Sequence, residues 1–124
     1  MDITPVVNKD VQLINGYGDG GFTIAGLRRE GSVLVLPGAT LPWSVASLDD
    51  LTPESLEGIV AAQPRPTVLI LGCGKGMRPV PKPIRDFLRP LGIVAEPMDT
   101  GAACRTFNVL LTEGRDVAAA LIAV

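Results

Sequence analysis

The stretch MDTGAACRTFNVLLTEGR, residues 98–115, predicts a turn that leads from a strand into a helix. It continues the short apolar run IVAEPM, residues 93–98, which is typical of a strand. Side-chain oxygens of the Asp-Thr pair are of the kind that cap a helix N-terminus. Four apolar side chains then share one helix face: Ala103, Phe107, Leu110 and Leu111. We therefore expect a helix from Thr100 to about Thr112, capped by Asp99 or Thr100.

The segments upstream repeat this alternation of strands with helices. GSVLVLPG (31–38) and PTVLILG (66–72) are apolar runs between turn residues, which is typical of strands buried on both faces. Helices are expected after Thr52, which precedes Pro53, and at Pro83, because proline suits the first helical position. Residues 11–17 and 22–25 flank Gly-Asp-Gly-Gly, which predicts a β-hairpin. The sequence therefore predicts one α/β domain, residues 1–124, with a largely parallel sheet.

The last apolar segment, VAAALIAV at residues 117–124, has two interpretations. Its alanines favour a helix by intrinsic propensity. An uninterrupted apolar run of this length is equally typical of a strand at the centre of a sheet. The pattern alone leaves both open.

The composition excludes several classes of function. A net charge of −2 and few aromatic residues (three Phe, one Trp, one Tyr) give no reason to expect nucleic acid as a partner. The chain has no histidine, which removes the hydrolase triads that use it and all His-ligated metal sites. We therefore expect no metal and no cofactor.

Targeting signals and cysteine content predict a cytoplasmic protein. The N-terminus, MDITPVVNKDVQL, shows neither the apolar core of a signal peptide nor the pattern of a mitochondrial presequence. No apolar run reaches roughly 18 residues, so membrane insertion is not expected. Cys73 and Cys104 lack CxxC spacing, which favours two lone buried thiols over a redox pair. A place in the first turns of a helix predicts a lowered thiol pKa for Cys104.

Asp99 to Ala102 spell Asp-Thr-Gly-Ala, the tetrapeptide that carries the catalytic aspartate of aspartic proteases, and Gly114-Arg115 follows. In the retroviral-type enzymes this motif sits early in an all-β chain. Here it stands between a strand and a helix near the end of the chain, where Asp-Thr is ordinary capping chemistry. We therefore predict no proteolytic activity.

The segments 69–93 (LILGCGKGMRPVPKPIRDFLRPLGI) and 98–122 (MDTGAACRTFNVLLTEGRDVAAALI) resemble the Mth-like domain family of small intracellular proteins, mostly of unknown function. One branch includes a mitochondrial assembly factor of respiratory complex I, and another an adipogenesis-associated protein. The resemblance implies a three-layer α/β fold with a mixed, mostly parallel central sheet, one antiparallel strand and an N-terminal β-hairpin. On that basis residues 117–122 are the antiparallel strand. It also implies a protein partner.

The loop GCGKGMR offers a candidate anion site. Its relevant residues are Gly72, Gly74, Lys75 and Arg78. Glycine-rich backbone after a strand, next to two cations, suits an anion. The spacing matches neither a Walker A loop nor a dinucleotide fingerprint, and a tight turn is the alternative. Residues 75–89 contain five basic residues and Asp86, a net charge of +4, which suggests an anionic ligand or an acidic partner.

A second polar set lies in the 98–115 stretch: Asp99, Thr100, Arg105, Asn108, Glu113 and Arg115. These residues form either a polar pocket at the carboxyl ends of the strands or a structural network, in which Asp99 and Glu113 offset the arginines. No residue is assigned a catalytic role.

Two classes of function follow. The first is a non-enzymatic accessory protein that binds a protein partner, linked to respiratory complex assembly. The second is a small-molecule or anion-binding protein, an enzyme of unknown reaction included, that uses residues 72–78 and 98–115.

Overall fold

A computed structural model of the chain describes residues 11–124. Residues 1–10, on which the predicted absence of a signal peptide or presequence depends, lie outside the described residues. Among those described, no helix has both the length and the apolar character needed to cross a membrane.

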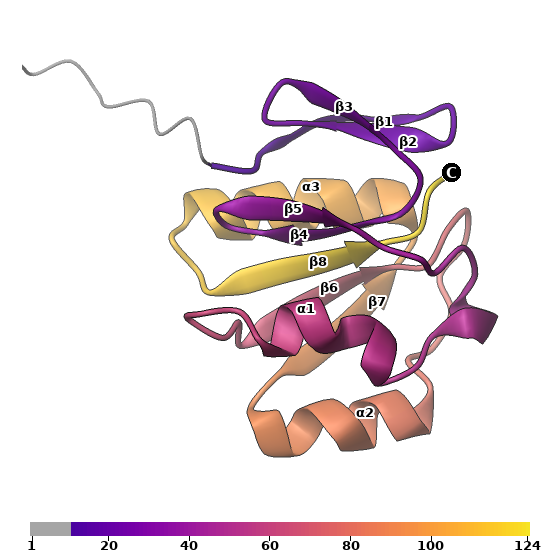
Figure 1. Cartoon of the computed structure of the whole chain (residues 1–124), viewed down its shortest axis with the longest axis vertical. Coiled ribbons are helices and arrows are strands. Elements are labelled where there is room, and N and C mark those ends of the chain that lie inside the picture. The colour runs from indigo at the N-terminus through magenta and orange to yellow at the C-terminus, as the bar shows by residue number, and fades with distance from the viewer. Residues whose placement is uncertain (1–10) are drawn as a thin grey trace, which may run out of the picture.

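A five-stranded mixed sheet forms the centre of the molecule (Figure 1), in the order β5-β4-β8-β6-β7. The strands are β4 (Val33–Leu36), β5 (Ala39–Pro42), β6 (Val68–Gly72), β7 (Val94–Met98) and β8 (Val117–Leu121). Strands β8, β6 and β7 are parallel, whereas β4 is antiparallel to both β8 and β5. A short β-hairpin is therefore attached to one side of a parallel three-stranded unit.

A second, three-stranded antiparallel sheet consists of β1 (Ile14–Gly18), β2 (Gly21–Ile24) and β3 (Leu27–Glu30). It lies on the same side of the central sheet as α3 (Thr100–Thr112). The opposite side is covered by α1 (Glu57–Val60), α2 (Lys82–Leu88) and the short 3-10 turns η1 (Leu48–Asp50), η2 (Glu54–Leu56) and η3 (Arg89–Leu91). The three-layer fold class is confirmed.

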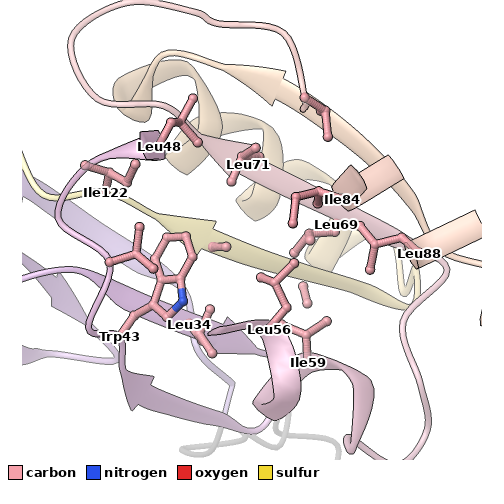
Figure 2. Packing of buried hydrophobic residues seen from close by; sticks show 14 of the residues in the cluster. Leu34, Trp43, Leu48, Leu56, Ile59, Leu69, Leu71, Ile84, Leu88 and Ile122 are labelled. Carbon is pink, nitrogen blue, oxygen red and sulfur yellow. The ribbon is translucent and has the colours of Figure 1, made fainter. Parts of the chain in front are cut away.

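Side chains that alternate along the central strands build two separate cores. Leu34, Leu69, Leu71, Ala118 and Ala120 belong to the core beneath α1 and α2, which Trp43 and Leu56 complete (Figure 2). The intervening residues of the same strands belong to the core beneath α3 and the three-stranded sheet, with Phe22 and Phe107. Strand β8 supplies both cores, and all five of its residues are buried.

Three predictions about secondary structure need correction. Residues 117–121 are the central strand that was expected, but β8 is parallel to β6. The one antiparallel strand among the five of the central sheet is β4, since β5 runs in the same direction as β8. Burial on both faces thus overrides the helix propensity of the alanines. The predicted N-terminal hairpin gains a third strand, β3. The helix expected after Thr52 is reduced to η2 and the single turn α1.

Each edge of the central sheet carries a proline whose nitrogen points away from its neighbouring strand. In β7, Val94 N donates to Thr67 O (3.0 Å) and Met98 O accepts from Cys73 N (2.8 Å), so the backbone groups of Pro97 face outward. In β5, Trp43 N donates to Ser32 O (2.9 Å), which turns the preceding Pro42 outward. Neither proline therefore interrupts a ladder, and each removes one N–H from an edge.

The double burial of β8 generates a stability prediction. Ala119→Leu inserts extra carbon atoms where the side chain is fully buried, and we expect it to lower the free energy of unfolding by about 1–3 kcal/mol. Ala39→Leu, the same change at an exposed position of β5, should stay within about 0.5 kcal/mol. Urea denaturation compares the two. Equal losses would show that β8 is not tightly packed.

Candidate functional site

The carboxyl ends of β8, β6 and β7 lie side by side at one end of the central strands. This is the usual place for a ligand in an open α/β fold. The chain runs from these strands into residues 72–78, 98–101 and 121–122. Several of the predicted site residues lie in these segments, so their contacts decide what the edge can bind.

Thr100 connects all three strand ends. Its fully buried hydroxyl donates to Ile122 O (2.7 Å) and accepts from Gly74 N (3.0 Å). Its own backbone N donates to Gly74 O (2.8 Å), and Ile122 N donates to Gly72 O (3.0 Å). The N–H of Gly74 is therefore occupied within the protein.

The other two residues of Asp-Thr-Gly also have structural contacts. Asp99 is the N-cap of α3, and its Oδ1 accepts from Ala102 N (2.9 Å). Gly101 lies directly beneath the hydroxyl group of Tyr17, where a Cβ atom would collide with the ring. Of the two predicted caps, Asp99 is correct, while Thr100 cross-links the strands.

Gly72 is required by close packing at the same place. A Cβ atom on Gly72 would lie 2.9 Å from Leu121 Cδ2 and 3.1 Å from Thr100 Oγ1. Strand β6 thus approaches its neighbours closely because this position has no side chain. The three strand ends are packed against one another.

The remaining predicted site residues do not form one cluster at the carboxyl ends of these strands. Asn108 holds β1, since Ile14 N donates to its Oδ1 and its Nδ2 donates to Ile14 O (both 2.8 Å). Arg78 pairs with Asp49 (3.0 Å). Lys75 and Arg105 are exposed, as are Glu113 and Arg115 at the far end of α3.

The predicted carboxylate network is not formed in the described part of the chain. Within residues 11–124, neither Asp99 nor Glu113 makes an ion pair with an arginine. The ion pair of Arg78 with Asp49 was not predicted from the sequence, because it joins residues 29 positions apart. Anion binding by the 72–78 loop stays a prediction.

Both cysteines are free and buried, and they belong to different cores. Burial raises the pKa of the Cys104 thiol to about 12. The lowered pKa expected from the helix dipole is therefore wrong, because desolvation of the thiolate outweighs the favourable end of α3. This thiol is a poor nucleophile near neutral pH.

A hollow lies at the opposite end of the central strands, where β6 and β8 begin. This apolar cavity has a volume of about 440 Å³, and sequence reasoning missed it. Its lining comes from three loops and the end of α3: residues 36–39, 62–64, 66, 111 and 114–117. Of the predicted site residues, Arg115 alone lines it. The prolines and glycines of these loops were the available signal, but they only mark turns.

A smaller hollow of about 280 Å³, here called the α2 groove, lies between α2 and β7. Its lining residues are Arg85, Leu88, Arg89, Gly92, Ile93, Val94 and Ala95. It adjoins the basic segment 75–89. No group of three or more acidic or cysteine side chains in residues 11–124 is placed to hold a metal ion.

The amino-acid sequence is similar to one protein family and to several individual proteins. Residues 14–122 match the model of a family described as protein of unknown function, DUF498/DUF598. An uncharacterized protein of Rhodobacter capsulatus is 42% identical over 110 residues, which cover 88% of this chain and 82% of that protein. NADH dehydrogenase (ubiquinone) 1 alpha subcomplex assembly factor 3 of Xenopus tropicalis is 38% identical over 115 residues. These cover 93% of this chain but 63% of the assembly factor, so the chain spans less than two thirds of that relative.

Solved structures agree with the fold. The crystal structure of a protein from Bartonella henselae, described as an outer membrane protein, has a TM-score of 0.86 and 34% identity, and covers 94% of this chain and 98% of that one. The solution structure of a Mth938-like domain from Bordetella pertussis has a TM-score of 0.82 and 26% identity, with coverage of 98% and 92%. The resemblance to the Mth-like domain family is confirmed.

The contacts of Thr100 predict its effect on stability. Thr100→Val removes the hydroxyl at nearly constant shape and leaves Gly74 N and Ile122 O unpaired. We expect it to lower the free energy of unfolding by about 1–3 kcal/mol. Thr100→Ser keeps the hydroxyl and should lose less. Denaturant melts of both variants measure the difference, and a serine variant as unstable as the valine variant would contradict this role.

The raised pKa of Cys104 predicts low reactivity. In a Cys73→Ser variant at pH 8, iodoacetamide should alkylate Cys104 far more slowly in the folded chain than in 8 M urea, because the folded thiol is buried and protonated. Mass spectrometry follows the modified fraction with time. Equal rates in the two solutions would show that the thiol is accessible and ionised.

Proposed function

We propose that this chain, which belongs to the family of proteins of unknown function described as DUF498/DUF598, is an accessory protein that binds a protein partner during assembly of a respiratory NADH dehydrogenase. The proposal names no reaction catalysed by the chain itself.

The observation that carries the proposal is the similarity to assembly factor 3 of the NADH dehydrogenase 1 alpha subcomplex, which extends over 93% of this chain. The same name applies to relatives from mouse and human, at 38% and 36% identity over 109 residues. Since 59% of each of those proteins is matched, functions that reside in their remaining parts are not transferred.

The contacts at the strand ends support a binding role. Asp99 and Thr100, which an enzyme of this fold would have available for chemistry, are hydrogen-bonded to the backbone of the protein itself. Cys104 is buried with a raised pKa. Exposed charged side chains, those of α2 among them, lie on the outer surface, where they can contact another macromolecule.

Removal of the gene from the native host tests the proposal. We expect the deletion to reduce fully assembled NADH dehydrogenase and to accumulate its subcomplexes, because a missing accessory protein slows one joining step. Blue-native electrophoresis with an in-gel NADH dehydrogenase stain measures both species. Expression of the wild-type chain should restore the complete complex.

The control is the amount of cytochrome oxidase in the same membranes, which should not change. A deletion strain with a normal amount and rate of NADH dehydrogenase assembly would refute the proposal. A parallel loss of both complexes would also refute it, since it would indicate a general effect on the membrane.

A further inference from the structure

We infer that the α2 groove is the docking site for an acidic, partly aliphatic segment of the protein partner. The inference rests on the proposed function, because it specifies the surface and the chemistry by which an accessory protein of this kind recognises its partner.

The charge distribution selects this surface. Residues 75–89 have a net charge of +4 in a chain whose net charge is −2, so the remaining residues sum to −6. Positive charge is thus concentrated on one segment of an otherwise acidic protein. Such an arrangement attracts a negatively charged partner toward this face and repels it from the others.

Within the basic segment, both arginines that line the groove are without a carboxylate partner among the described residues. Lys82 pairs with Asp86 (2.7 Å) and Arg78 with Asp49 (3.0 Å). In the described part of the chain, neither Arg85 nor Arg89 makes an ion pair. Being four residues apart, with Arg89 N donating to Arg85 O, they lie on the same face of the helical segment, and both line the groove.

Apolar residues line the groove between these arginines and β7. Leu88 and Ile93 are buried, Ala95 is half-buried, and Val94 is 58% exposed. A segment that brings two carboxylates to the arginines can therefore bury aliphatic side chains at the same time. A fully polar ligand, such as inorganic phosphate, would leave this apolar surface uncovered.

The backbone of β7 limits how the segment binds. Only Ala95 directs both an N–H and a C=O outward within the part of β7 that lines the groove, and Pro97 offers no N–H beyond it. A partner strand consequently finds few backbone hydrogen bonds along this edge. Recognition depends on side chains, which makes the charge and apolar character of the partner decisive.

The opposite side of α2 differs in charge. A hollow there is lined by Pro53, Glu54, Glu57, Val60 and Phe87. Its two glutamates would repel an acidic segment, so binding is confined to the side that carries Arg85 and Arg89.

Binding is tested with a five-residue peptide of alternating glutamate and leucine, capped at both ends, at low ionic strength. We expect saturable movement of the amide signals of residues 85–95, which weakens as salt rises. A peptide with glutamine in place of glutamate should not bind. The double variant Arg85→Glu/Arg89→Glu should bind the acidic peptide with an affinity lower by about tenfold or more.

The matched control is Arg105→Glu/Arg115→Glu, which reverses the charge of two exposed arginines, one in α3 and one in the loop after it. Circular dichroism first establishes that both double variants are folded. Equal loss of affinity in the two variants, or signal changes centred away from residues 85–95, would overturn the inference. Concentration-dependent dimers of the wild-type chain that Arg85→Glu/Arg89→Glu abolishes would also overturn it, since a second copy would then occupy the groove.

The deletion strain separates this inference from the proposed function. If the wild-type chain and Arg105→Glu/Arg115→Glu restore NADH dehydrogenase but Arg85→Glu/Arg89→Glu does not, the result supports both the groove inference and the assembly role. If all three restore it, the groove inference fails and the assembly role remains. If deletion leaves assembly unchanged while the peptide binds as expected, the assembly role fails.

Discussion

The hydroxyl of Thr100 joins the ends of the three parallel strands β8, β6 and β7, and the rest of the fold is built around these strands. It donates to the end of β8 and accepts from the loop after β6, while its own residue begins the helix that follows β7. Three segments distant in the sequence are thereby fixed at one buried point. The two cores on either side of the central sheet share these strands, so the register set here is common to both.

This use of the strand ends changes where function is to be sought. In many open α/β proteins the carboxyl ends of the strands form a ligand site. Here Gly72, Asp99 and Thr100 pack and hydrogen-bond the carboxyl ends of the strands against one another. The remaining surface has an uneven distribution of charge, with the basic residues concentrated on and before α2.

Local signals predicted much of the fold. Asp99 and the apolar spacing up to Leu111 were sufficient to place α3, because caps and helix faces depend on near neighbours. The orientation of β8 depends on distant partners, and the apolar pattern of residues 117–121 is the same for either direction. Likewise, the basic character of Arg85 and Arg89 was visible in the sequence. The groove they line was not, since it exists only where β7 lies beside α2.

The outward-facing prolines at 42 and 97 have a consequence for aggregation. An unpaired strand at the edge of a sheet can act as a template for another chain and so start a cross-β aggregate. An edge interrupted by an absent N–H offers an incoming strand too few consecutive hydrogen bonds to nucleate such growth. The central sheet can thus leave both of its edge strands uncovered and still resist growth into a larger sheet.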